Sequence, residues 1–150
     1  MNQNKPYHIL LADDDEDDTF LFREALEQIP VSTKLRVAEN GMELMHSLME
    51  YQAVPDIIFL DMNMPVKNGL ECLKEIRNSD HYKEVPVIIL STSIASYLLE
   101  SAYRGGANLY IQKPTNFSDL VSILKNCLSN KEDLILSPDL EQFLIKNDNN

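Results

Sequence analysis

In the stretch HILLADDDEDD, from His8 to Asp18, an apolar run of four residues leads directly into six consecutive acidic residues. Ile9 to Ala12 has the composition of a buried strand, and the carboxylates begin where that strand would end. A helical pattern follows, in which apolar residues recur at three- and four-residue intervals: Leu21, Phe22, Ala25, Leu26 and Ile29. The acidic block is therefore either a solvated loop or a group of carboxylates that holds a hard divalent cation.

The composition indicates one globular domain and argues against several classes of function. The chain has 150 residues, 44% of them hydrophobic and 25% charged, and a net charge of −11 without a basic cluster, which disfavours nucleic-acid binding. No apolar stretch reaches the roughly 18 residues of a membrane span, and the N-terminus lacks the apolar core of a signal peptide. Cys72 and Cys127 fall in helical patterns without a common motif, so we expect reduced, half-buried thiols in a cytoplasmic protein.

Strand-like and helical segments alternate along the chain after this first strand. The further strand-like runs are Lys34–Ala38, Asp56–Leu60, Pro86–Leu90 and Asn108–Gln112. Helical patterns cover 21–29, 42–51, 70–76 and about 95–104, and a last helix is capped by Asn116 or Ser118. Strands that alternate with helices predict an α/β doubly wound, five-stranded parallel sheet with helices on both faces, in three layers.

Polar side chains follow the expected strands at the point where each strand ends. Asp13-Asp14 follows the first strand, Asp61 the third, Ser91-Thr92 the fourth and Lys113 the fifth. The carboxyl ends of parallel strands meet at one edge of the sheet, and sites of such folds lie there, where the strand order reverses. We therefore expect these side chains to form one site.

These motifs resemble the receiver domain of bacterial response regulators, the family of chemotaxis-type regulators, over about residues 7 to 130. The residues that carry the resemblance are Asp13-Asp14, Asp61-Met62-Asn63-Met64-Pro65 with Gly69, Ser91-Thr92, Tyr110 and Lys113-Pro114. The resemblance implies a flavodoxin-like strand order of 2-1-3-4-5. The polar link 78–84 and the run Leu90-Ser91-Thr92-Ser93 resemble stand-alone receivers that partner phytochrome-type sensor kinases.

Asp61 is the candidate nucleophile, because a carboxylate can accept a phosphoryl group as an acyl phosphate once the approaching dianion is neutralised. The resemblance implies Mg²⁺ for that purpose, with Asp14 and Asp61 as direct ligands, the backbone carbonyl of Asn63 as another, and Asp13 acting through water. The residues themselves do not decide between Asp13, Asp14 and Asp15. The implied phosphodonor is a histidine kinase or a histidine phosphotransfer protein.

Three further residues complete the implied site. Lys113 would supply a positive charge to a phosphate oxygen, or it forms only a salt bridge to Asp61 or Asp13. Ser91 would bind the phosphoryl group and draw its loop inward, and Tyr110 would then rotate into the vacated space as a conformational switch. Tyr110 is otherwise a core aromatic residue with a satisfied hydroxyl. The bond between Lys113 and Pro114 could be cis.

The remaining features lie outside this site. Asp15–Asp18 are expected to cap the first helix and meet its positive end. Phe20 falls opposite the apolar stripe of that helix, so we expect it to be exposed, as part of a docking surface for a phosphodonor or as an isolated aromatic residue. The extension 131–150 includes a helix start at Ser137-Pro138-Asp139 and has no room for an output domain. We expect this extension to pack on its own domain, with homodimerisation as the alternative.

Five functions compete for this set of residues. The leading prediction is a single-domain response regulator that signals to a downstream protein effector, and the alternatives nearest to it are a phosphate-relay protein and a pseudo-receiver that only binds partners. A Mg²⁺-dependent aspartyl phosphohydrolase needs an acid/base residue two positions after the nucleophile, where Asn63 cannot take a proton. A nucleotide- or flavin-binding module needs a glycine-rich loop, where this chain has carboxylates.

Overall fold

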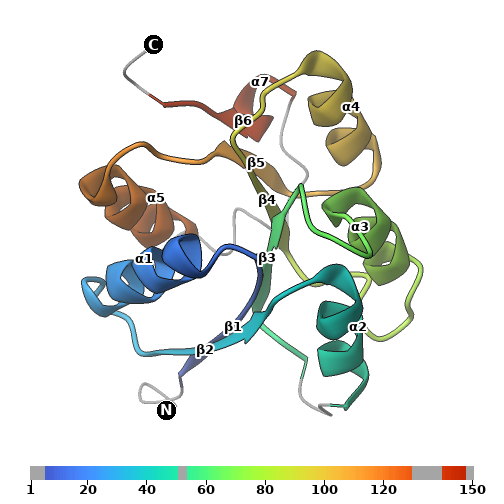
Figure 1. Cartoon of the computed structure of the whole chain (residues 1–150), viewed down its shortest axis with the longest axis horizontal. Helices are drawn as coiled ribbons and strands as arrows, with labels where there is room; N and C mark the ends of the chain where they lie inside the picture. Colours follow the sequence, from blue (N-terminus) through green and yellow to red (C-terminus); the bar gives the residue numbers. More distant parts are fainter. Residues whose placement is uncertain (1–5, 51–53, 130–139, 148–150) are drawn as a thin grey trace.

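The computed structural model describes residues 6–50, 54–129 and 140–147, which form one sheet and its covering helices. The sheet has six parallel strands in the order β2-β1-β3-β4-β5-β6 (Figure 1). The strands are β1 (Tyr7–Ala12), β2 (Thr33–Ala38), β3 (Ile57–Asp61), β4 (Val87–Ser91), β5 (Leu109–Gln112) and β6 (Leu144–Ile145). The helices are α1 (Glu16–Glu27), α2 (Gly41–Glu50), α3 (Gly69–Arg77), α4 (Ser96–Arg104), α5 (Phe117–Ser129) and α7 (Leu140–Phe143).

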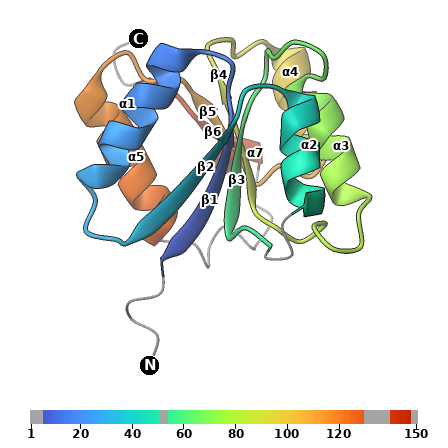
Figure 2. The ribbon, with the colours of Figure 1, turned by 60° about the horizontal axis from the view of Figure 1, so that its bottom comes forward.

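Helices cover both faces of the sheet, which confirms the predicted doubly wound fold. Figure 2 shows α1 and α5 on one face and α2, α3 and α4 on the other. Every residue of β3 and β4 is buried, because the central strands have helices above and below. That burial explains why their sequences are continuous apolar runs that end in Asp61 and Ser91.

Side-chain caps fix where several helices begin. Asp15 is the N-cap of α1, and its carboxylate accepts the backbone N–H groups of Asp17 and Asp18. Asn116 accepts the N–H of Asp119 at 2.8 Å, so Asn116 rather than Ser118 caps α5. Both caps are short polar side chains that satisfy otherwise unpaired N–H groups of the first turn.

The structure corrects three details of the sequence analysis. The sheet has a sixth strand, β6, which a two-residue run does not announce in the sequence. Leu21, predicted to point inward, is 42% exposed because it lies at the rim of a cavity between α1 and the start of α5. Cys72 and Cys127 are free thiols as expected, but both are fully buried rather than half-buried.

Within the described ranges, no helix has the length and apolarity needed to cross a membrane.

The C-terminal segment packs on the outer edge of the sheet. β6 pairs with β5, with Tyr110 opposite Leu144. The buried ring of Phe143 contacts Tyr103 edge-on, at 5.1 Å between centroids, and Tyr110 at 6.2 Å. Residues 140–147 thus pack on their own chain, whereas the predicted helix start at residues 137–139 lies outside the described ranges.

Candidate functional site

The site lies at the carboxyl end of the sheet, at the point where the strand order reverses between β1 and β3. The registers place Ala12 beside Leu60, so Asp13 and Asp61 leave neighbouring strands at the same level. Asp13, Asp14 and Asp61 each offer an oxygen within 4.8 Å of the others. Asp13 and Asp61 are buried and Asp14 is exposed, which leaves the cluster open on one side.

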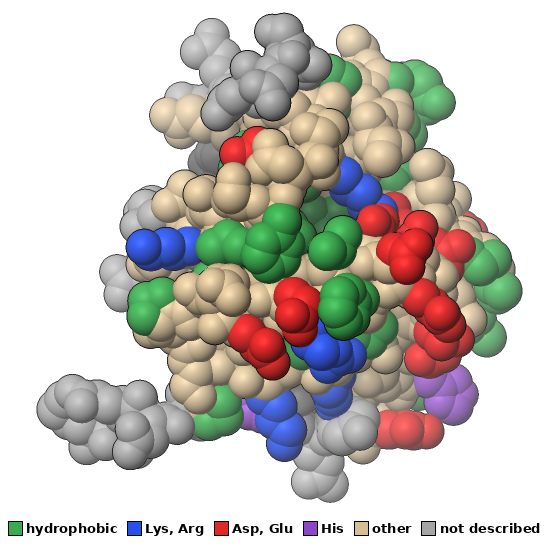
Figure 3. Space-filling view, turned by 60° about the vertical axis from the view of Figure 1, so that its left-hand side comes forward, with side chains coloured by type: hydrophobic (Ala, Val, Ile, Leu, Met, Phe, Trp, Pro, Cys, Tyr) green, Lys and Arg blue, Asp and Glu red, His purple; other side chains and the backbone are tan. Residues whose placement is uncertain are grey.

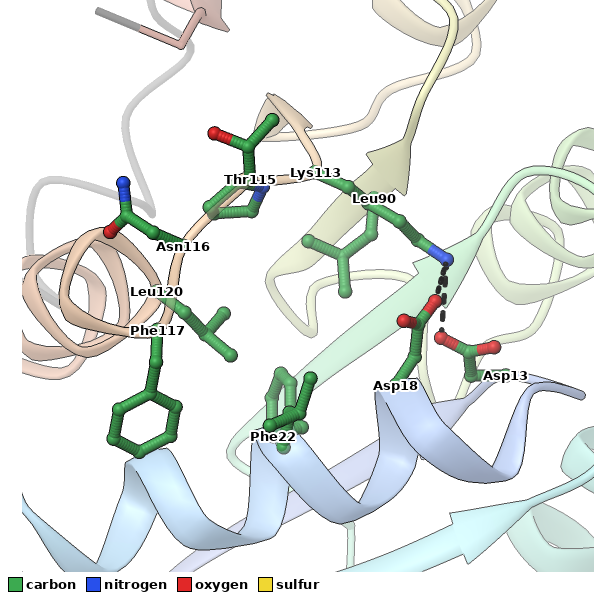
Figure 4. A pocket seen from close by; sticks show the side chains of 11 residues that line it. Asp13, Asp18, Phe22, Leu90, Lys113, Thr115, Asn116, Phe117 and Leu120 are labelled. Carbon is green, nitrogen blue, oxygen red and sulfur yellow. Dashed lines mark hydrogen bonds and ion pairs between the residues drawn. The ribbon is translucent and has the colours of Figure 1, made fainter.

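Lys113 reaches this cluster from the end of β5. Its Nζ lies 2.8 Å from an Asp18 oxygen, 3.3 Å from Asp13 and 3.4 Å from Asp61. Figure 4 shows the ammonium group between Asp18, which rises from α1, and Asp13, at the end of β1. The ammonium therefore compensates part of the negative charge that the three carboxylates concentrate in this small volume.

Burial and charge shift the pKa values of two groups in this cluster. Burial raises the pKa of Asp13 to about 6, and the carboxylates of Asp61 and Asp18 add to the rise against the opposing effects of the Asp15 N–H and Lys113. Burial alone would lower the pKa of Lys113, but its hydrogen bond to Asp18 and the charges of Asp13 and Asp61 outweigh burial and raise it. Lys113 is thus a permanent cation, whereas Asp13 can gain a proton in mildly acidic solution.

The donor set fits a hard divalent cation. Three carboxylates from two strand ends provide the oxygen ligands that Mg²⁺ and Mn²⁺ prefer, and the exposed Asp14 leaves room for water ligands. Lys113 lies near Oδ2 of Asp61, and the backbone N–H of Asn63 donates to Oδ1 of the same carboxylate at 3.3 Å. The role of the Asn63 carbonyl as a ligand, implied by the family resemblance, stays a prediction.

Gly69 lets the loop after β3 fold back against the site. Its N–H donates to the carbonyl of Met62 at 3.1 Å. A Cβ atom at this position would lie 2.7 Å from the backbone oxygen of Asp61, which is too close for any side chain. The glycine of the motif is therefore explained by the close approach of two backbone segments beside the candidate nucleophile.

Ser91 and Tyr110 lie next to each other behind the carboxylates. The Ser91 hydroxyl accepts the N–H of Ser93 at 3.1 Å, and the Tyr110 hydroxyl donates to the Ser93 carbonyl at 2.7 Å. Burial raises the pKa of the Tyr110 hydroxyl, and a hydrogen bond with the Ser91 side chain opposes that rise. Tyr110 is already fully buried, with its ring under Phe143, so its switching role stays a prediction.

Asp18 lies in the first turn of α1, as predicted, but it also has a partner at the site that was not predicted. Asp15 caps α1 as predicted, but Asp18 turns its carboxylate to Lys113 and makes the shortest of that lysine's ion pairs. The position of Asp18 on the first turn of α1 is visible in the sequence, but its distance from β5 is not. The peptide bond between Lys113 and Pro114 is trans, because the described residues contain no cis peptide bond. Thr92, which follows Ser91 at the end of β4, is exposed.

Phe20 is 60% exposed, as predicted from its place opposite the apolar stripe of α1. It borders a hollow that also includes Asp13, Asp14 and Arg23. Figure 3 shows hydrophobic side chains gathered across the side of the molecule where α1 and α5 lie, with acidic side chains beside them. Leu21 and Phe117 are the other large hydrophobic residues exposed on these two helices.

A parallel sheet of this order, with an acidic cluster at β1 and β3, a hydroxyl at β4 and a lysine at β5, defines the class of receiver domains. The chain belongs to this family, because the sequence model of the family, the response regulator receiver domain, matches residues 9–125. Its members are signalling domains of two-component systems that bind a divalent metal at an acidic pocket.

Known relatives include regulators associated with phytochromes. Response regulator Rcp1 of Synechocystis sp. is 32% identical over 127 residues, which cover 81% of this chain and 86% of Rcp1. The phosphorylated cyanobacterial phytochrome response regulator RcpA has a crystal structure with 35% identity and a TM-score of 0.76, covering 81% of this chain and 91% of that chain. The Mn²⁺-bound structure of Rcp1 shows 30% identity and a TM-score of 0.76, covering 89% of this chain and all of that chain (100%).

Proposed function

We propose that this protein is a single-domain response regulator that accepts a phosphoryl group on Asp61 in a Mg²⁺-dependent reaction. One observation carries the proposal: the Asp61 carboxylate is buried between the acidic pair of β1 and the ammonium of Lys113, at 3.4 Å. A buried carboxylate surrounded by groups that can neutralise a phosphate is suited to accept a phosphoryl group rather than only to stabilise the fold.

In the proposed reaction an oxygen of Asp61 attacks the phosphorus of a phosphohistidine. A phosphorus–oxygen bond forms, the phosphorus–nitrogen bond breaks, and the imidazole leaves with a proton from solvent. Bound Mg²⁺ would supply positive charge for the phosphate oxygens, held by Asp14, Asp61 and the Asn63 carbonyl, with Asp13 acting through water. Lys113 contacts a phosphate oxygen, as its short distance to Asp61 supports.

Ser91 binds the new phosphoryl group in this proposal, and its loop transmits the change to Tyr110. Hydrogen bonds already connect these residues, because the Ser93 N–H donates to the Ser91 hydroxyl and the Tyr110 hydroxyl donates to the Ser93 carbonyl. When the Ser91 hydroxyl turns to phosphate, it gives up the N–H of Ser93 and frees that loop to move. The local charge change thereby reaches the surface beside α4.

The partners would be a sensor histidine kinase or a histidine phosphotransfer protein, and a downstream protein effector. Phe20, exposed beside the acidic pair, would take part in docking the phosphodonor. Residues 1–130 would form the receiver domain and 131–150 an extension, and the burial of Phe143 supports packing of the extension on its own domain, with a homodimer as the alternative. The two buried free thiols are in keeping with a cytoplasmic location.

Slow loss of phosphate, rather than enzymatic turnover, follows from the same residues. Asn63, two positions after Asp61, is exposed and cannot act as a general base for an attacking water. A phosphate-relay protein or a pseudo-receiver would share this fold, and the latter would not take up phosphate at all.

The test is incubation with radiolabelled acetyl phosphate or a phosphorylated phosphotransfer domain, with and without Mg²⁺. We expect label on the wild type that depends on Mg²⁺ and is absent from Asp61→Asn. Equal labelling of Asp61→Asn contradicts the proposal, and an unlabelled wild type favours the pseudo-receiver. Phe20→Ala should slow transfer from the phosphotransfer domain but leave labelling by acetyl phosphate unchanged.

A further inference from the structure

We infer that Asp18 is a positioning residue that binds the Lys113 ammonium in the resting protein and competes with a phosphoryl group on Asp61 for it. The inference rests on the proposed function, because it assigns Asp18 a part in phosphorylation of Asp61. It extends the site to a residue of α1 that lies outside the acidic pair, the lysine and the hydroxyl.

The geometry makes Asp18 the principal partner of the lysine. Lys113 Nζ donates a charge-assisted hydrogen bond of 2.8 Å to Asp18 and a longer one of 3.3 Å to Asp13, whereas Asp61 lies at 3.4 Å as an ion pair. The Lys113 side chain is only 18% exposed, so its ammonium depends on protein groups for most of its hydrogen bonds. Figure 4 shows Asp18 approaching the ammonium from α1, beside Asp13.

Phosphorylation of Asp61 would increase the negative charge that faces Lys113. In the resting protein, Lys113 compensates the negative charges of Asp13, Asp18 and Asp61 together. A phosphoryl group on Asp61 adds charge at one of these three points and needs the ammonium there. The three N–H groups of the ammonium are shared among these carboxylates in the resting protein, so the bond to Asp18 competes with a phosphate on Asp61 for them and opposes the phosphorylated state.

The chain offers a matched control for this effect. Asp17 has the same charge and lies in the same first turn of α1, but its side chain is exposed, and the carboxylates that pair with Lys113 within the described ranges are Asp13, Asp18 and Asp61. Asp17→Asn and Asp18→Asn therefore remove the same charge from the same helix end. Only the second substitution weakens the hold on the lysine.

The experiment measures acetyl phosphate labelling, loss of label after donor removal, and binding of beryllofluoride with Mg²⁺, a stable mimic of the phosphoryl group, by NMR. We expect Asp18→Asn to raise the labelling rate and the phosphoryl lifetime by about threefold to tenfold and to lower the half-saturating beryllofluoride concentration by a similar factor. Asp17→Asn should stay near the wild type. Asp18→Glu, which keeps the carboxylate, should restore much of the restraint.

Melting temperatures of the variants show that they are folded before they are compared. Asp18→Asn that matches Asp17→Asn in rate, lifetime and beryllofluoride binding overturns the inference, as does Asp18→Asn that labels more slowly than the wild type. In both of those cases a labelled wild type leaves the proposed function standing. A wild type that takes up neither phosphate nor beryllofluoride overturns the proposed function and this inference with it.

Discussion

Strand β5 touches two regions that are held together by different forces. At its carboxyl end, Lys113 joins the carboxylates of Asp13, Asp18 and Asp61 in a cluster of charges. At its outer edge, β6 and the buried ring of Phe143 pack against Tyr110, mainly through apolar contact. The first region concentrates like charges that cost folding free energy, and the second removes apolar surface from water.

The difference indicates that function and stability are divided between these regions. Substitutions in the charged cluster should change phosphate and metal binding strongly and stability slightly, or even favourably. Substitutions at the outer edge should change stability strongly and leave the chemistry at Asp61 intact. Four substitutions or conditions test this division, in order of decreasing expected effect.

Truncation of the buried aromatic ring at the outer edge should have the largest effect. Phe143→Ala removes a fully buried ring from contact with Tyr103 and Tyr110, and we expect the free energy of unfolding to fall by about 3–5 kcal/mol. Urea unfolding measures this change, and acetyl phosphate labelling of the folded protein should persist. Phe20→Ala, the same truncation at an exposed ring, should change stability by no more than about 0.5 kcal/mol. Equal stability changes in the two variants would contradict the division.

Neutralising Asp13, the buried carboxylate that follows β1, should increase the stability of the protein rather than lower it. Burial raises the pKa of Asp13 to about 6, so the folded state binds this proton more tightly than the unfolded state and loses stability as the pH rises through that range. Asp13→Asn avoids the cost, and we expect it to raise the free energy of unfolding at pH 7 by about 1–2 kcal/mol, less toward pH 4. Urea unfolding at both pH values checks this, and a less stable variant at pH 7 would show that the pair with Lys113 outweighs burial.

The same proton should compete with the divalent cation. Below a pH of about 6 the Asp13 carboxylate becomes protonated, so we expect the affinity for Mg²⁺ to fall as the pH falls, by up to about tenfold per pH unit. Calorimetric titration between pH 5 and pH 8 measures this dependence. Asp13→Asn serves as the control, since its lower affinity should vary less over that range. An affinity of the wild type that is constant over that range would rule out Asp13 as a participant.

Removing the tyrosine hydroxyl should have the smallest effect. Tyr110→Phe loses the hydrogen bond to the Ser93 carbonyl but keeps the ring under Phe143, and we expect a loss of about 0.5–1.5 kcal/mol. Labelling by acetyl phosphate should be unchanged, because Tyr110 lies behind the carboxylates. A large loss of labelling in this variant would show that the two regions are not independent.

Sequence reasoning predicted the fold and most of the site for a local reason. Apolar runs that end in Asp13, Asp61, Ser91 and Lys113 mark the ends of parallel strands, and all such ends lie at one edge of a sheet. Asn116 was one of two caps proposed for α5 and proved to be the cap. These features depend on residue type and on spacing within one element, both of which are visible along the chain.

The missed features depend on contacts between elements that are distant in sequence. Asp18 and Lys113 lie 95 residues apart, and nothing within the acidic run distinguishes a carboxylate that faces β5 from one that faces water. Leu21 follows the apolar period of α1 but borders the cavity between α1 and the start of α5, which leaves it 42% exposed. β6 has two residues and exists only because β5 offers an unpaired edge beside it.

The strands, the helices and the chemical types gathered at the carboxyl end of the sheet could therefore be predicted along the chain, because periodicity and strand ends are local properties. The three-dimensional arrangement was needed to show that Asp18 pairs with Lys113 beside Asp13 and Asp14, whereas Asp15 caps α1 as predicted. The reason is physical, since the direction and partner of a carboxylate depend on which helix and strand ends come together in space.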